Sequence, residues 1–370
     1  MDQREAYILL NMMEGVGPVT VRNLADALGA PDDILQAPAG ALTAVPGVGN
    51  GLADKILRQR ETLDAQREIK RAAEMGLRLI TPADGEYPEQ LKQIHDPPLA
   101  LYVMGDLQPG DRHAIAVVGT RHATVYGRET ATRLSDRLAR AGWTVVSGLA
   151  RGIDTFAHTA ALNAGGRSLA VLGGALDHIY PVENKDLARR LAQQGAVLSE
   201  FPLGRKPDRT TFPMRNRIVS GLSRAVLVVE AGRKSGALIT ANQALEQGRG
   251  VMAVPGRVDS PASRGTHQLL KNGARLVEDL DDILEEFEFL VPSAEPPPTP
   301  PPEVNLTPEQ RLVLQALREE EQDFDALIRA TGITAARMNV LLLELEMRRQ
   351  IRLLPGRLVT LVQRDGAARP

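Results

Sequence analysis

The sequence contains no cysteine among its 370 residues. Disulfide bonds and thiolate metal sites are therefore excluded, and the absence agrees with a reducing compartment. The six histidines are scattered without metal-ligand spacing, so we expect no bound metal. We predict a cytoplasmic location.

Aromatic residues and long apolar runs are also scarce. Aromatics make up only 3% of the chain, which argues against a partner held by base stacking alone. No stretch approaches the roughly 20 apolar residues of a membrane-spanning helix. The first fifteen residues lack the basic region and cleavage site of a signal peptide. We therefore expect no membrane partner.

The chain has no overall basic excess, since its formal net charge is -2. Its positive charge is concentrated locally instead. Between Phe201 and Lys234 there are eight Lys or Arg residues and only two acids, Asp208 and Glu230. Such a local excess favours a polyanionic partner more than the net charge suggests.

Residues 291–304 are dominated by proline and predict an extended spacer. A proline-rich docking ligand is the alternative interpretation. The spacer separates the folded parts of the chain. We predict a helical domain over 1–76, a Rossmann-like domain over 77–290, the linker over 291–304, and a winged helix over 305–365.

The central domain alternates continuous apolar runs with helical patterns. Runs of this kind predict strands buried on both faces of a parallel sheet. Ligands of such sheets bind at the carboxyl ends of the strands. The fold class is therefore α/β, with an extended Rossmann-like core. The expected strands lie at 114–119, 144–148, 168–174, 196–200, 225–231, 251–256 and 274–279.

The N-terminal part contains two similar glycine turns, Gly15-Val16-Gly17-Pro18 and Pro46-Gly47-Val48-Gly49. A turn of this type between two helices resembles the helix-hairpin-helix, found in SAM-like domains, which binds the DNA backbone through free helix amides. A small helical domain whose glycines only make tight turns is an equally good interpretation, because few basic residues flank the turns.

The C-terminal part shows three helical patterns and a ribbon turned at Pro355-Gly356, which is the winged-helix order. Its third helix offers Arg337 and Asn339 among many leucines. From Glu303 onward, ten Arg are balanced by ten acids. A groove-reading module usually has a basic excess, so we favour a protein-contact or accessory role.

The ends of the central strands lack the motifs of known nucleotide sites. The glycine fingerprint of dinucleotide folds and the Walker phosphate loop are both absent, so we expect no cofactor. Glycines, hydroxyls and arginines occur there instead, and they suit an anion. The candidates at these strand ends are Gly119, Thr120, Arg121, Ser147, Gly148, Arg151 and Gly174.

Two further segments add candidates. Phe212 precedes Arg215, Asn216 and Arg217 at a predicted helix start. Because Arg215 and Arg217 are two positions apart, they point in different directions, and one could hold a ligand while the other braces the loop. Lys234, Ser235 and Thr240 open the helix after the strand at 225–231. Ordinary helix capping explains Ser235 but not Thr240.

Two features could indicate catalysis. Asp154 and His158, one helical turn apart, could form an acid–base pair, although an aspartate at a helix start is more often a cap. Glu230, at a strand end, could polarise a water. Without a nucleophile or metal cluster, we expect no catalytic residues.

Together these segments resemble the DprA/Smf family of DNA-processing proteins of natural transformation. Residues 119–121, 147–154, 212–222 and 235–240 give the resemblance, which extends over about residues 80–290. It implies a single-stranded DNA pocket in which Arg121 and the Arg215–Arg217 run contact phosphates. It also implies homodimerisation through the Rossmann-like domain and loading of the RecA recombinase.

Two other functions stay open on the sequence alone. One is a Rossmann-like nucleotide phosphohydrolase of the lysine-decarboxylase-like type, although residues 230–236 depart from the Pro-Gly-Gly-x-Gly-Thr motif of those enzymes. The other is a winged-helix transcription regulator, for which residues 305–370 alone would bind duplex DNA.

Overall fold

The structure is a computed structural model that describes residues 1–287, 307–317, 322–347, 350–354 and 358–361. It divides into two compact units, residues 1–291 and 292–370. The division falls at the start of the predicted linker. The linker residues 291–304 themselves lie outside the described residues.

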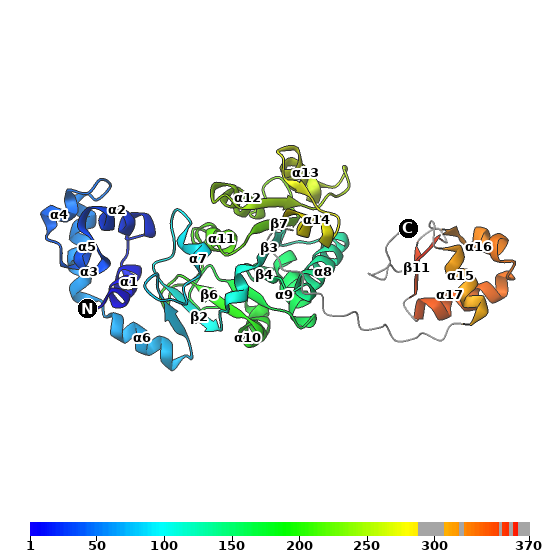
Figure 1. Cartoon of the computed structure of the whole chain (residues 1–370), viewed down its shortest axis with the longest axis horizontal. Helices are drawn as coiled ribbons and strands as arrows, with labels where there is room; N and C mark the ends of the chain where they lie inside the picture. The colour runs from blue at the N-terminus through cyan, green and yellow to red at the C-terminus, as the bar shows by residue number, and fades with distance from the viewer. Residues whose placement is uncertain (288–306, 318–321, 348–349, 355–357, 362–370) are drawn as a thin grey trace. The chain divides into compact units, whose positions relative to one another are not determined.

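Six helices form the N-terminal part of the first unit (Figure 1). They are α1 (Gln3–Met12), α2 (Pro18–Leu28), α3 (Pro31–Gln36), α4 (Ala39–Thr43), α5 (Asn50–Thr62) and α6 (Ala65–Glu74). The predicted glycine turns join α1 to α2 and α4 to α5. Gly15 and Gly47 adopt φ values of +86° and +89° in them, which glycine tolerates without a steric penalty. The two hairpins are therefore confirmed.

The helical part is joined to the central sheet by buried polar contacts. The Tyr102 hydroxyl donates to Glu68 Oε1 at 2.8 Å, and the Leu203 amide donates to the same oxygen at 2.8 Å. Asn11 Nδ2 donates to the Glu200 carbonyl oxygen at 2.9 Å. One apolar cluster, which includes Leu9 and Tyr102, also spans both parts. The helices and the sheet are thus packed as one unit.

The central part is a nine-stranded sheet in the order β1-β2-β6-β5-β4-β3-β7-β8-β9. The seven strands from β3 to β9 are mutually parallel, as predicted. The strands are β1 (Arg78–Ile80), β2 (Leu101–Gly105), β3 (Ala114–Gly119), β4 (Thr144–Ser147), β5 (Ser168–Val171), β6 (Ala196–Ser199), β7 (Ala225–Glu230), β8 (Gly250–Ala253) and β9 (Arg275–Leu276).

The sequence analysis did not identify β1 and β2. Both take part in antiparallel pairings: β2 pairs with β6, and β1 pairs with β2. Only the short helix α7 (Glu89–Lys92) lies between them, so the alternation of strand and long helix that revealed the other strands is missing. The sheet is therefore mixed at this edge.

Helices cover both faces of the sheet. On one face, α8 (Val125–Arg140), α9 (Ile153–Asn163), α10 (Lys185–Gln194) and α14 (Leu280–Leu284) bury their apolar side chains. On the other face lie α7, α11 (Thr211–Gly221), α12 (Ala237–Glu246) and α13 (Arg264–Lys271). Short 3-10 turns lie at Pro109–Arg112, Val182–Asn184, Pro261–Ser263 and Glu285–Phe287. Double coverage explains why the strands read as unbroken apolar runs.

The second unit has the predicted winged-helix order. Its elements are α15 (Pro308–Ala316), β10 (Gln322–Asp323), α16 (Phe324–Thr331), α17 (Ala335–Met347), β11 (Ile351–Leu354) and β12 (Leu358–Leu361). Its strands pair in the order β10-β12-β11. The predicted turn at Pro355-Gly356 lies outside the described residues.

In the described part of the chain, no single helix has both the length and the apolar content to cross a membrane. The helices at Phe324–Thr331 and Ala335–Glu346 satisfy the criterion only as a pair, and they are bent by 109°.

Candidate nucleic-acid interface

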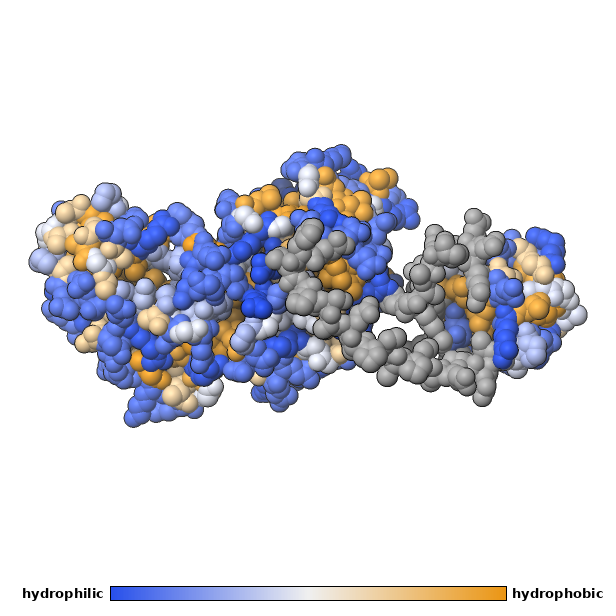
Figure 2. Space-filling view, viewed as in Figure 1, coloured by the Kyte–Doolittle hydropathy of each residue, from blue (hydrophilic) through white to orange (hydrophobic). Residues whose placement is uncertain are grey.

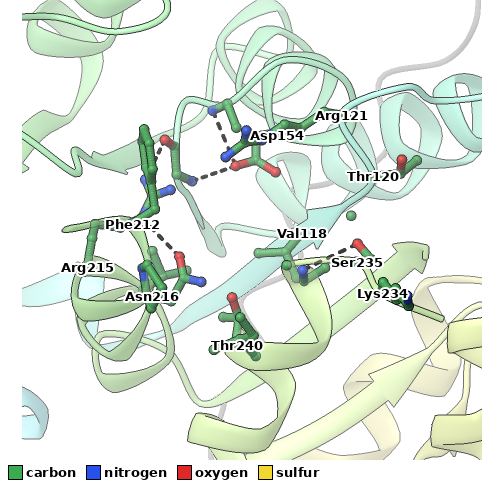
Figure 3. Close-up of a pocket in the computed structure, with 18 of the residues that line it drawn as sticks. Val118, Thr120, Arg121, Asp154, Phe212, Arg215, Asn216, Lys234, Ser235 and Thr240 are labelled. Atoms are coloured by element: carbon green, nitrogen blue, oxygen red, sulfur yellow. Dashed lines mark hydrogen bonds between the residues drawn. The ribbon is translucent and has the colours of Figure 1, made fainter. Parts of the chain in front are cut away.

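A cavity of about 650 Å³ opens at the carboxyl ends of β3, β4 and β7 (Figure 3). The chain proceeds from β3 to β4, β5 and β6 on one side, and then crosses over to β7 on the other side of β3. Loops that leave β3 and β7 therefore diverge here, which is where open α/β sheets bind ligands. We call this cavity the central pocket.

Ten of the predicted site residues line the central pocket. They are Gly119, Thr120, Arg121, Gly148, Phe212, Arg215, Asn216, Lys234, Ser235 and Thr240. They come from segments that lie far apart in the chain, and Figure 3 shows the side chains of several of them around one space. The structure thus brings most of the predicted set together.

Three exposed cations at this pocket have no acidic partner among the described residues. Arg121, Arg209 and Lys234 all line it, and none forms an ion pair there. The Arg121 guanidinium carbon lies 5.3 Å from the centroid of the Phe212 ring, which holds the side chain by a cation–π contact. Arg209 was not in the predicted set, although it belongs to the basic segment that the sequence analysis identified.

Arg215 stabilises the floor of the pocket and is not an exposed cation. Its side chain is buried, and Nη1 donates to the carbonyl oxygens of Gly148 and Val171 at the ends of β4 and β5. Burial lowers the pKa of Arg215 to about 10, which the nearby Asp154 carboxylate opposes, so the group stays charged at neutral pH. A side chain at Gly148 would overlap this guanidinium, with a Cβ only 2.3 Å from Nη1.

Arg217 does not line the pocket, so its predicted phosphate contact requires correction. Its side chain is buried on the other side of α11, where Nε lies 2.9 Å from Asp96 Oδ2 and Nη2 lies 2.5 Å from Glu200 Oε2. The physical reason is the helix: residues two apart on α11 face different directions. The sequence suggested that one of the two arginines holds the ligand while the other braces the loop, whereas in the structure both Arg215 and Arg217 have bracing contacts.

Three other predicted residues also lie outside the pocket lining. Ser147 is buried, and its hydroxyl donates to the Val117 carbonyl at 2.7 Å. Arg151 pairs with Glu183 and lies over the Tyr180 ring. Gly174 lies against Pro207, where a Cβ would come within 2.8 Å of the ring. Each residue has a structural partner that its strand-end position did not reveal.

Comparison with known proteins identifies the chain. Residues 78–288 match the DNA recombination-mediator protein A family, residues 296–357 match the DprA winged helix domain, and residues 7–62 match the SAM-like helix-hairpin-helix tandem. The chain belongs to the DNA recombination-mediator protein A family. This confirms the resemblance that the sequence motifs indicated.

Individual members of this family are similar to the chain over most of its length. Protein Smf of Synechocystis is 36% identical, with 94% of this chain and 96% of that protein covered. The crystal structure of DprA from Streptococcus pneumoniae matches with a TM-score of 0.68 and 32% identity, over 77% of this chain and 98% of that chain. DprA from Helicobacter pylori, whose structure was described for its single-stranded DNA binding mode, matches with a TM-score of 0.52 and 30% identity, over 57% of this chain and 96% of that chain.

The acidic residues near the central pocket form structural hydrogen bonds. Glu230 accepts hydrogen bonds from the Thr124 amide at 2.9 Å and the Thr124 hydroxyl at 2.7 Å, which fixes the start of α8. Asp154 Oδ2 accepts from the amides of Gly148 and Ala150 at 3.1 and 3.3 Å. Burial raises the pKa of Asp154, and Arg215 opposes this. The expected aspartate cap is therefore a brace for the loop after β4.

His158 does not form an acid–base pair with Asp154 in the pocket. Its ring is completely buried, and Nδ1 lies 2.7 Å from Ser168 Oγ. Burial lowers the pKa of His158 to about 3, so the ring is neutral at physiological pH. The family model that matches residues 78–288 is described as a DNA recombination-mediator protein. Within the described ranges, no group of three His, Asp or Glu side chains could hold a metal ion.

Gly152 allows the loops after β3 and β4 to approach each other. Its φ is +78° and its ψ is -130°, and a Cβ there would lie 2.3 Å from Thr120 O and 2.7 Å from Arg121 C. We expect Gly152→Ala to cost about 1–3 kcal/mol in backbone strain, with a further cost for displacing the Arg121 loop. Thermal unfolding of the purified variant measures the loss.

Gly142→Ala is the matched control for this substitution. Gly142 also has a positive φ, +81°, but no atom lies within 4 Å of the position that a Cβ would take there. It should therefore show the cost of a positive φ without the clash. Equal destabilisation of the two variants would contradict the close approach as the reason for glycine at position 152.

Proposed function

We propose that the central pocket binds the phosphates of single-stranded DNA and that the protein acts as a recombination mediator. The observation that supports this most directly is a group of three cations around one cavity, Arg121, Arg209 and Lys234, which have no ion-pair partner in the described part of the chain. The hydroxyls of Thr120, Ser235 and Thr240 line the same cavity, and Gly119 adds close backbone approach at the end of β3. Several cations along one opening suit a phosphodiester chain.

The shape of the pocket favours a single strand over a duplex. Its cations and hydroxyls lie in a recess of about 650 Å³ at the ends of the strands, between the loops that follow β3 and β7. A flexible single strand can insert phosphates and sugars into such a recess. A duplex is too wide to enter and could touch only the rim. The similarity to DprA from Helicobacter pylori, which was described for its single-stranded DNA binding mode, also supports single-stranded DNA as the ligand.

We expect an oligonucleotide to bind at least about 10-fold more tightly as a single strand than as a duplex of the same sequence. If three phosphates are neutralised, the slope of log K against log salt should be about -2 for the single strand. Fluorescence anisotropy over a salt series measures both quantities. Equal affinities for the two forms would contradict a recessed site.

RecA loading and homodimerisation through the Rossmann-like domain are further parts of the proposal. Exposed apolar side chains near the β9 edge support the dimer: Leu276 on β9 is 46% exposed and Leu245 at the end of α12 is 59% exposed. Figure 2 shows hydrophobic surface over α12 and α13. RecA loading is supported by the family relationship alone. The cytoplasmic location stays a prediction.

The winged helix is proposed to be an accessory, protein-contacting module. Arg337, a candidate for DNA reading, is paired with Glu309, with Nε and Nη2 at 2.8 and 2.6 Å from the same oxygen. Val340 and Leu343, one turn apart on α17, are 45% and 58% exposed. An exposed apolar pair beside a neutralised arginine suits a protein partner better than phosphates.

The alternative of a nucleotide phosphohydrolase receives no support from the site. Glu230, the residue that would act on a water, has both carboxylate oxygens bonded to Thr124. The transcription-regulator alternative is weakened by the Arg337 pairing.

A further inference from the structure

A second cationic cavity lies beside the central pocket at the same edge of the sheet. It has a volume of about 430 Å³, and its lining includes Arg233, Leu238, Arg264, His267 and Lys271 but no carboxylate side chain. Both α12 and α13 pack against β7 and β8, so the cavity lies where the carboxyl end of β7 meets these helices. The Gly265 amide at the start of α13 donates to the Ala231 carbonyl just after β7, at 2.7 Å.

The loop of residues 232–236 separates the two cavities. Lys234 and Ser235 line the central pocket, whereas Arg233 lines the second cavity. Adjacent cations in this loop therefore face different sides of it. A strand that leaves the central pocket at Lys234 would meet Arg233 next, and Arg264 and Lys271 beyond it.

The cations of the second cavity have no ion-pair partner within the described ranges. Arg233, Arg264 and Lys271 are exposed, and none has an ion pair or side-chain hydrogen bond among the described residues. The nearby Asp259 is bonded to Arg257 at 3.1 and 3.0 Å. That hydrogen bond is the main reason that the pKa of Asp259 is lowered, and Arg264 makes only a minor contribution.

His267 adds a polar group to this cluster. Its Nε2 lies 2.9 Å from the Gly256 carbonyl oxygen and therefore donates to it. This bond fixes the ring in the lining of the cavity. Like charges that gather without an internal partner repel one another, and an external anion removes this repulsion.

We infer that the cavity formed by Arg233, Arg264, His267 and Lys271 is a second phosphate subsite, which holds the stretch of single-stranded DNA that leaves the central pocket. The inference rests on the proposed function, because it extends the route of the same ligand. It adds three cations to those of the central pocket. The bound strand then runs from the β3 loop across residues 232–236 to α13.

The test compares a short and a long single strand on the full-length protein. An oligo(dT) of about 5 nucleotides fills the central pocket only, whereas one of about 15 nucleotides can reach both subsites. The variant Arg233→Gln/Arg264→Gln/Lys271→Gln removes the three charges and keeps polar side chains of similar length. The matched control is Arg67→Gln/Lys70→Gln/Lys185→Gln, three exposed cations on α6 and α10, away from both cavities.

We expect the variant to bind the short strand within about 2-fold of the wild type. For the long strand, the loss of three phosphate contacts predicts about 10- to 100-fold weaker binding near 0.15 M salt and a salt slope reduced by about 2. The control variant should retain both affinities. Light scattering on the same samples reports the oligomeric state, which we expect to be unchanged.

Three results would overturn the inference. The first is an equal loss for short and long strands, and the second is no loss for the long strand beyond that of the control. The third is a change of oligomeric state that accounts for the lost affinity, which would assign the cations to a contact between copies of the chain. Failure of the wild type to bind either strand would instead contradict the proposed function itself.

Discussion

Replacing Arg217 by alanine is expected to destabilise the protein by about 3–5 kcal/mol, because it would leave a buried carboxylate without its cation. The Glu200 side chain is only 7% exposed, and Arg217 Nη2 is 2.5 Å from its Oε2. Asp96, one-third exposed, loses its partner too but can be solvated. Thermal or urea unfolding measures the loss.

The pH dependence identifies Glu200 as the cause. Burial already raises the pKa of Glu200 above its usual value of 4.5, and Arg217 opposes this. In Arg217→Ala that opposition is gone, so the folded-state pKa rises further. The folded variant then favours the protonated acid. The resulting loss of stability is absent below the unfolded-state pKa, grows as the pH rises from there to the raised folded-state pKa, and stays constant above it.

We therefore expect the gap between the variant and the wild type to be smaller near pH 5 than near pH 8. The double variant Arg217→Ala/Glu200→Gln is the control, since it removes the charge that the single variant leaves unpaired. It should recover part of the lost stability at pH 8. A single variant as stable as the wild type at every pH would contradict the assigned bracing role.

The two arginines of α11 show what the sequence can and cannot predict about the site. Their spacing predicts that they face apart, and the structure confirms it. It does not tell which one faces the pocket, because that depends on Asp96 and Glu200, whose positions next to α11 arise from the tertiary fold. For the same reason, the pairing of Arg151 with Glu183 could not be anticipated.

The fold itself could be predicted further than the site. Strands buried on both faces leave a continuous apolar run in the sequence, so all seven parallel strands were identified. The antiparallel strands β1 and β2 have no long helix between them, and this removed the periodic signal. The glycine-rich strand ends predicted the position of the pocket. Which of its polar side chains lack an internal partner depends on residues that are distant in the sequence, and this could not be predicted.

The largest expected effect on binding follows from this distinction between free and bracing cations. Arg121 and Lys234 are exposed and unpaired among the described residues, so Arg121→Ala/Lys234→Ala should weaken single-strand binding by about 100-fold and reduce the salt slope by about 1.4. Its unfolding temperature should stay close to that of the wild type. Anisotropy over a salt series, with thermal unfolding of the same sample, gives both measurements.

Arg215→Ala, in contrast, should lower the stability of the protein. This change removes the donor to Gly148 and Val171 and leaves the buried Asp154 without its cation, so the protein should lose stability. Arg121→Lys is a charge-preserving control and should retain the salt slope. If the double variant bound with wild-type affinity and slope, the free cations would not be phosphate contacts. If Arg215→Ala were as stable as the wild type, the guanidinium would not brace the ends of β4 and β5, and its charge would be available to the DNA after all.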